Sequence, residues 1–172
     1  PPQRAGDLVG QEGPHAVAHD HERPVQGEPA EFLRQISCQN LEVGGQWLVE
    51  PAIVAWEGDE VSMQFANQLA QPSTIHWHGI RLPLEMDGVP YVSQLPVKPG
   101  EFFDYKFRVP DAGSYWYHPH VNSSEELGRG LVGPLIVEER EPTGFKHERT
   151  LSIKNWHVDE EGAFLPFSIT RE

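Results

Sequence analysis

The sequence predicts an all-β fold, a sandwich or barrel of short antiparallel strands in a single domain. Two observations support this class. Gly and Pro each number 16 among the 172 residues, which is rich in turn formers for a chain without a collagen-like repeat. Apolar and polar residues alternate with the period of two of half-buried strands, and no segment has helical periodicity. A helical bundle is therefore disfavoured, and the length suits one domain.

Two segments show this alternation most clearly. Residues 61–67 (VSMQFAN) follow the turn residues 57–59 (EGD), and residues 102–109 (FFDYKFRV) lie between two Pro- and Gly-bearing turns. The other expected elements are strands at Phe32 to Cys38, Glu50 to Ala55, Ser73 to His78, Ser114 to Val121, Val132 to Glu138 and His147 to Asn155, and a short helical turn at Ser123 to Leu127.

The chain is expected to divide into three parts. Residues 1–30 are polar, with almost no large apolar side chain, and are interpreted as a flexible tail because they cannot bury enough surface to offset the entropy of ordering. Residues 31–158 form the folded domain, and residues 159–172 are a connector. The tail carries His15, His19 and His21, whose spacing could hold a metal loosely but is interpreted as ordinary polar-tail composition.

Charge and cysteine content exclude several function classes. The formal charge is −13, with no cluster of Lys or Arg, which argues against a nucleic-acid partner and against an anionic membrane surface. There is no apolar run of membrane-spanning length and no apolar signal segment at the N-terminus. The single cysteine, Cys38, cannot form an internal disulfide and is expected to be a small buried side chain.

The most informative residues are two H-x-H pairs, His76-Trp77-His78 and His118-Pro119-His120. Residues i and i+2 of a strand project from the same face, so each pair presents two imidazoles in one direction. Two such strands side by side would bring four nitrogen ligands together, and imidazole suits Cu, Zn, Fe and Ni.

Two alternatives to such a site remain at this point: the two H-x-H pairs occur by chance, or they belong to a zinc site. A structural zinc site is disfavoured because it usually takes Cys ligands, of which the chain has one. A hydrolytic zinc site would need a nearby carboxylate base, which Glu85 or Asp87 could supply.

Two long segments of the sequence then resemble a known family. Residues 73–107 (STIHWHGIRLPLEMDGVPYVSQLPVKPGEFFDYKF) and 114–139 (SYWYHPHVNSSEELGRGLVGPLIVEE) look like the first cupredoxin domain of the multicopper oxidases, which include laccases and bacterial copper-resistance oxidases. The resemblance runs from about Val49 to about Glu139, over half of the chain. It implies a cupredoxin-like Greek-key β-sandwich or barrel.

The resemblance also implies a ligand set. In that family the first domain supplies half of the histidines of a trinuclear copper cluster, and the last domain supplies the rest. By motif, His76 would ligate the type 2 copper, and His78, His118 and His120 would ligate the type 3 pair. Asp87 of the MDG motif matches an acidic residue that assists proton delivery to reduced dioxygen, although an ordinary Asp-Gly turn is an equal interpretation.

The mononuclear type 1 copper of the family has no counterpart in this sequence. That site needs a Cys thiolate within an HCH-type segment, and Cys38 has no His beside it. His147 and His157 are assigned to no metal. The chain therefore resembles a fragment or separated domain, with copper partial or absent and no oxidase activity in isolation.

The leading hypothesis is the first domain of a copper-dependent oxidoreductase that passes electrons from a reducing substrate to dioxygen, forming water. Its partners would be the remaining cupredoxin domains, dioxygen, and a phenol or metal ion as the reducing substrate. A second copy of the chain is a further candidate partner. The alternative is a stand-alone copper carrier or buffer. A third interpretation, a two-domain relative that assembles its site between subunits, conflicts with the missing blue-copper cysteine. The resemblance implies a periplasmic or secreted protein.

Overall fold

The computed structural model describes residues 15–19, 32–38, 52–141, 143–145, 147, 149–155, 157 and 159–161; for 15–19 and 32–38 only the backbone is described. Its strands are β1 His15–His19, β2 Phe32–Cys38, β3 Ile53–Trp56, β4 Glu60–Asn67, β5 Ile75–His78, β6 Phe102–Arg108, β7 Gly113–Pro119, β8 Gly133–Glu138 and β9 Thr150–Lys154. The helices are short, a 3₁₀ turn η1 at Leu84–Met86 and α1 at Ser123–Gly128.

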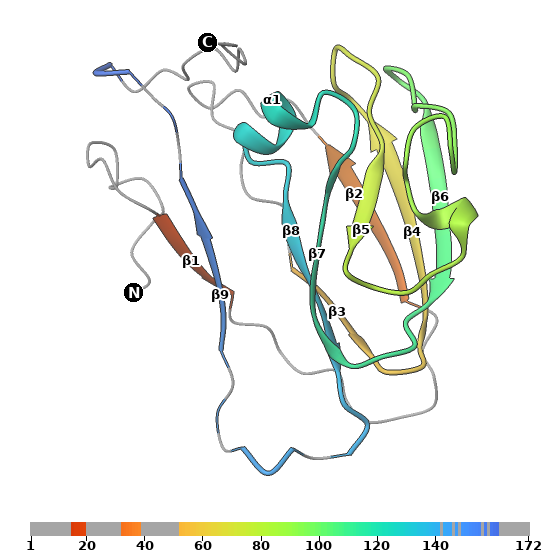
Figure 1. The fold of residues 1–172 in the computed structure, drawn as a ribbon, viewed down its shortest axis with the longest axis vertical. Coiled ribbons are helices and arrows are strands. Elements are labelled where there is room, and N and C mark those ends of the chain that lie inside the picture. The colour runs from red at the N-terminus through yellow and green to blue at the C-terminus, as the bar shows by residue number, and fades with distance from the viewer. Residues whose placement is uncertain are drawn as a thin grey trace.

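The strands form two main sheets and a separate ribbon (Figure 1). One sheet has the order β2-β4-β6, and the other has the order β3-β8-β7-β5. Pairs β4–β6, β5–β7 and β7–β8 are antiparallel, as the sequence predicted. Pairs β2–β4 and β3–β8 are parallel, which corrects the expectation of wholly antiparallel sheets. Parallel partners need a crossover connection, and here these partners are not joined by hairpins.

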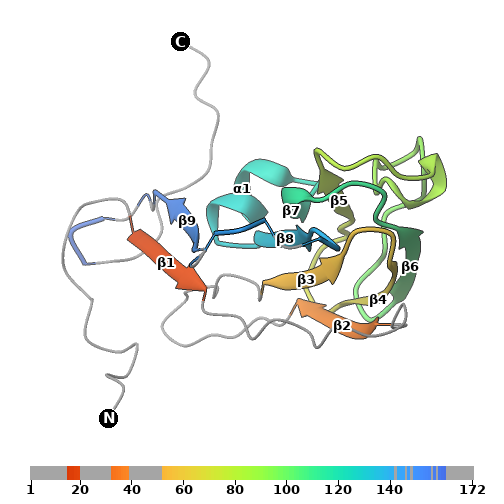
Figure 2. The ribbon, with the colours of Figure 1, turned by 90° about the horizontal axis from the view of Figure 1, so that it is seen from below.

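The two sheets pack face to face in layers, as Figure 2 shows. Alternate residues of β4 and β6 point inward, among them Met63, Phe65 and Tyr105, and meet the inward residues of the other sheet. Trp77 of β5 lies near the centre, 1% exposed, with its ring centroid 5.4 Å from that of Tyr105 and 5.6 Å from that of Tyr117. Burial of such large aromatic rings dominates core energetics.

A buried hydrogen bond also joins the sheets at the start of β5. The backbone N–H of Ile75 donates to the hydroxyl of Tyr105 on β6 at 3.0 Å. This bond and the packing of Trp77 fix the height and rotation of β5 against the opposite layer. The alternating outward residues of β5 are therefore held on a rigid support.

The third unit is an antiparallel ribbon of β1 and β9, which lies to one side of the sandwich in both views (Figures 1 and 2). Composition had predicted no regular element before residue 31, and β1 lies within that polar segment. Its backbone is paired along its whole length, from His15 opposite Lys154 to His19 opposite Thr150. A hydrogen-bonded ladder does not require apolar side chains, which is why composition gave no signal for it.

The predicted all-β class is confirmed, and the sheets form a sandwich rather than a closed barrel. The strand at Phe32–Cys38 begins and ends where the sequence predicted, and the other predicted strands differ by one to three residues at one end or at both. The helical turn after His120 is confirmed as α1. Among the described residues, no helix combines the length and apolar character needed to cross a membrane.

Candidate metal centre

Adjacent strands β5 and β7 bring the two H-x-H pairs together. The strands are antiparallel, and their register sets His76 directly opposite His118 and His78 opposite Trp116. The intervening residues Ile75 and Trp77 point into the core. Because successive side chains of a strand alternate between faces, the imidazoles share the outer face of the sheet. The predicted juxtaposition of the two pairs is confirmed.

Three of the imidazoles converge closely. His76, His78 and His118 each offer a ring nitrogen, and these three atoms lie within 4.8 Å of one another. The ring centroid of His76 is 5.6 Å from that of His78 and 5.3 Å from that of His118. The three side chains therefore surround one small volume with nitrogen donors.

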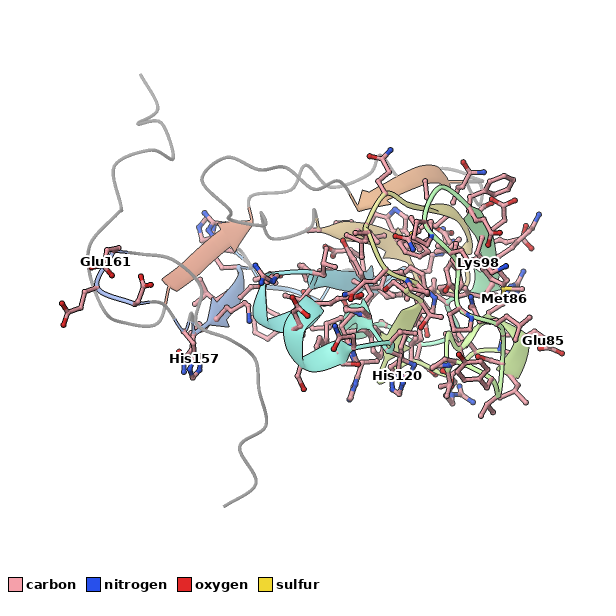
Figure 3. All side chains as sticks on the ribbon, turned by 90° about the horizontal axis from the view of Figure 1, so that it is seen from above. Glu85, Met86, Lys98, His120, His157 and Glu161 are labelled. Carbon is pink, nitrogen blue, oxygen red and sulfur yellow. The ribbon has the colours of Figure 1, made fainter. Side chains whose placement is uncertain are left out.

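The fourth histidine, His120, lies just beyond the end of β7 at Pro119, so no ladder bond of β5 holds it. Its ring centroid is 5.1 Å from that of His76 and 5.9 Å from that of His118. It thus faces the same cluster, although the convergent group found among the described residues contains only the other three. His120 is exposed, and Figure 3 shows it at the surface of the sandwich.

The backbone around Asp87 fixes the ring of His76. Nδ1 of His76 donates to the carbonyl oxygen of Asp87 at 2.7 Å, and the carboxylate Oδ1 of Asp87 is 3.2 Å from the same nitrogen. A carbonyl oxygen only accepts, so the proton of neutral His76 is on Nδ1. Nε2 keeps its lone pair, as metal-binding histidines require.

His118 is fixed in the same way by its neighbour in the chain. Its Nδ1 donates to the carbonyl oxygen of Pro119 at 2.9 Å, which leaves Nε2 as an acceptor 3.3 Å from Nδ1 of His78. Burial lowers the pKa of His118, and nearby His76, His78 and His120 lower it further, whereas the bond to Pro119 opposes this. A lowered pKa keeps the imidazole neutral and able to bind a metal ion.

The indole ring of Trp116 packs against two of the histidines. Its ring stacks on His78, with centroids 4.7 Å apart, and on His118, with centroids 4.3 Å apart. One indole thus contacts a member of each histidine pair. The contact restricts the rotamers of both imidazoles.

The donor set fits copper. Imidazole nitrogens suit Cu, and two nitrogens bound to one ion at about 2.0–2.1 Å cannot lie more than about 4.2 Å apart. The separation of 3.3 Å between His78 Nδ1 and His118 Nε2 is within that limit.

Other residues considered from the sequence lie elsewhere. Glu85 is exposed on η1 and lies apart from His120 (Figure 3), whereas Asp87, the other carboxylate considered as a base for zinc, is in contact with His76. His147 and His157 are exposed, and His157 lies well apart from His120 (Figure 3). The side chains of His15, His19 and Cys38, and all of His21, lie outside the described residues.

One buried acid near the site was not predicted. Glu126 of α1 is 0% exposed, and its two carboxylate oxygens accept hydrogen bonds from Gln71 Nε2 at 2.8 Å and Ser73 Oγ at 2.6 Å. In the sequence, SSEELGR has the composition of a solvated helical turn. Only the packing of α1 against residues 71–73 distinguishes Glu126 from its exposed neighbours.

Comparison with known proteins gives consistent results. The multicopper oxidase family profile matches residues 25–142. Copper resistance protein A of Pseudomonas syringae pv. tomato is 40% identical over 123 residues, which is 70% of this chain and 20% of that protein. Copper resistance protein A of Escherichia coli is 37% identical over 116 residues, 66% of this chain and 19% of that protein.

Solved structures agree with this similarity. The multi-copper oxidase from Pseudomonas parafulva has a TM-score of 0.75 and 65% identity, covering 80% of this chain and 37% of that one. The enzyme from Pseudomonas thermotolerans has a TM-score of 0.71 and 52% identity, covering 83% of this chain and 38% of that one. The predicted cupredoxin-like fold is confirmed. The chain spans about a fifth of the length of the curated relatives it matches.

Proposed function

This chain belongs to the multicopper oxidase family, and on that premise we propose that it is the first cupredoxin domain of such an enzyme, contributing half of the histidines of a trinuclear copper cluster. The observation that supports the proposal most directly is the convergence of His76, His78 and His118 within 4.8 Å on one face of the β5–β7 pair. We assign His120, whose ring faces the same cluster, as the fourth ligand.

The family motif assigns each histidine a role, and the contacts of the histidines are compatible with it. His78 and His118 would share one copper of the type 3 pair, because their facing nitrogens are 3.3 Å apart. His120 would bind the other copper of that pair, and His76, anchored by the Asp87 carbonyl, would bind the type 2 copper. Bound copper would supply the one-electron chemistry that reduces dioxygen to water.

Asp87 is assigned as a proton relay. Its carbonyl oxygen accepts the hydrogen bond that positions His76, so the carboxylate is not needed for that task. That carboxylate is partly exposed, with 30% of the side chain accessible, and lies 3.2 Å from the His76 ring. A carboxylate open to water on one side and next to the ligands on the other can carry protons inward.

The full-length protein would contain further cupredoxin domains, and these would supply the electron-entry copper and the remaining ligands. The partial coverage of the relatives supports this. A phenol or a metal ion would be the reducing substrate. Within this chain, residues 31–158 would form the domain, residues 1–30 a tail and residues 159–172 a connector. As the family resemblance implies, the protein would be periplasmic or secreted, which cell fractionation would test.

A stand-alone copper-binding module is the second candidate. It is favoured by one observation, that three nitrogen donors converge within this single chain without a partner. A carrier would bind copper tightly as a monomer, whereas half of a cluster site would bind it weakly until the rest of the enzyme is present.

Titration of the 172-residue chain with Cu²⁺, followed by electron paramagnetic resonance and calorimetry, tests the proposed function. We expect weak binding with nitrogen hyperfine structure. Replacing either His78 or His118 with Ala should remove most of the Cu²⁺ binding. Replacing both should reduce the affinity little further, because both nitrogens bind one ion. His157→Ala is the matched control, since His157 is exposed and outside the cluster. Binding that survives His78→Ala and His118→Ala together would contradict the ligand assignment.

A further inference from the structure

Glu126 joins the helix that follows His120 to the segment that precedes His76. Its carboxylate accepts hydrogen bonds from Gln71 and Ser73, and the side chain is completely buried. The residue before α1 contacts the same segment, since Asn122 Nδ2 donates a hydrogen bond to Gln71 Oε1 at 3.2 Å. The helix α1 is thus tied at its start and in its middle to one short segment, residues 71–73.

That segment is itself firmly held. Ser73 exchanges two backbone hydrogen bonds with Val97, at 3.0 and 2.9 Å. The carbonyl of Gln71 accepts a bond from Asn67 Nδ2 at 2.9 Å, and Asn67 is fully buried. The segment therefore acts as a fixed support, to which Glu126 attaches α1.

His120 is the ligand most dependent on this attachment. The ladder of β5 and β7 ends with Ile75 opposite Pro119, so it directly positions His76, His78 and His118 but not His120. Beyond Pro119 the chain turns through Asn122, whose backbone is left-handed with φ 47°, and enters α1. The position of His120 thus depends on β7 on one side and on the anchored helix on the other.

We propose that Glu126 is a positioning residue for His120, which it holds against the other three histidines by fastening α1 to Gln71 and Ser73. The proposal rests on the proposed function in taking His120 as a copper ligand. Residues that hydrogen-bond directly to metal ligands orient them, and their loss usually weakens metal binding about 10- to 100-fold. The loss of Glu126, which acts on His120 through α1, should have an effect at the lower end of that range.

The attachment should also respond to pH. Burial raises the pKa of Glu126 from 4.5 to about 7, the bonds from Ser73 and Gln71 lower it, and nearby Glu125 raises it. Arg129 is bound to Glu125 rather than to Glu126. On β7, which packs against α1, the titratable residues are Tyr115, Tyr117 and His118. Because burial is the largest of these effects, the attached state favours the neutral acid, and release of the helix, which exposes the carboxylate to water, becomes easier as the pH rises through about 7.

The test compares Glu126→Ala, Glu126→Gln and Glu138→Gln in the 172-residue chain. Glu138 is the matched control, a buried carboxyl at the end of β8. In the metal-free chain, we expect Glu126→Ala to shift and broaden the imidazole NMR signals of His120 more than those of His118. With Cu²⁺ as the probe, Glu126→Ala should weaken binding about 10-fold. Glu126→Gln should restore part of this loss, and Glu138→Gln should change nothing.

Two further readouts separate positioning from general stability. In a His120→Ala background, Glu126→Ala should have no further effect on Cu²⁺ affinity, because its action runs through His120. The ratio of wild-type to Glu126→Gln affinity should fall as the pH rises past about 7. Equal effects of Glu126→Ala in both backgrounds, or unchanged His120 signals, would overturn the proposal.

The outcomes also distinguish this proposal from the function on which it rests. If the wild-type chain binds no Cu²⁺, the proposed function fails, and the His120 signals of the metal-free variants alone decide the role of Glu126. If Glu126→Ala does not fold, Ser73→Ala removes one of the two bonds and should give the same changes at smaller size. Unchanged His120 signals in folded Ser73→Ala and Glu126→Gln would then overturn the proposal.

Discussion

Gly88 packs directly against the backbone of Ile75, so that a Cβ atom at residue 88 would lie 1.7 Å from the Ile75 carbonyl oxygen. This contact places the chain after η1 against β5 at the residue before His76. It explains how Asp87, next to Gly88, reaches the ring of His76 with both its carbonyl and its carboxylate. The MDG motif is therefore more than a turn signal, because its glycine sets the distance between two parts of the site.

Gly88→Ala should destabilise the fold and separate Asp87 from His76. The backbone at residue 88 is left-handed, with φ 74°, and an added methyl would also collide with β5. Gly100→Ala is the matched control, since its φ is 81° and nothing lies within 4 Å of the added Cβ. Denaturant unfolding should show a cost of about 1–2 kcal/mol for Gly100→Ala and about 1–3 kcal/mol more for Gly88→Ala. Equal costs would show that the close approach is relieved without strain.

Asp87→Asn should separate ligand positioning from proton delivery. The backbone carbonyl that holds His76 Nδ1 is unchanged by the substitution, so Cu²⁺ binding should change less than about 10-fold. The amide cannot carry a proton as the carboxylate does, so dioxygen reduction by the full-length enzyme should fall about 100-fold or more, within the range of general acid–base catalysis. Turnover is measured by oxygen consumption. Full activity of Asp87→Asn would exclude the relay.

The isolated chain should be inactive even with added copper. Among the described residues it presents one convergent histidine group, and its single cysteine, Cys38, has no His beside it in the sequence. Oxygen uptake with a phenol or with Cu⁺ as reductant should stay at the background of free copper ions. Oxidation above that background, removed by His76→Ala, would show that this domain completes a site by itself or by self-association.

Glu126→Gln should change the pH dependence of folding stability. The folded-state pKa of Glu126 is raised from 4.5 to about 7, so the fold favours the protonated acid. This contribution is fully present below pH 4.5 and is lost as the pH rises through about 7. The stability of Glu126→Gln relative to wild type should therefore increase across that interval and then level off. Urea unfolding at a series of pH values measures the difference, in which the other titrating groups cancel. A constant difference would mean that Glu126 titrates normally.

The sequence predicted the sandwich well because its strands are short, alternate clearly and are separated by turn residues. The alternation in residues 61–67 and 102–109 is reproduced in the burial of β4 and β6. The parallel pairs and the β1–β9 ribbon were not predicted. Pairing partners are set by backbone hydrogen bonds between distant segments, and side-chain periodicity carries no record of them. The polar composition of residues 1–30 thus concealed a strand.

For the site, the H-x-H spacing by itself determined that each pair of imidazoles would share a face, because the period of a strand is two. It also indicated nitrogen ligands, since both metal-binding side chains of each pair are imidazoles. The tertiary structure decided the rest. The register of β5 and β7 set His76 opposite His118, the Asp87 and Pro119 carbonyls selected Nε2 as the free nitrogen, and the packing of α1 buried Glu126. Apart from the bond of His118 to its neighbour Pro119, these features depend on contacts between residues that are not adjacent in the chain, whose distances are fixed only when the strands and the helix have packed.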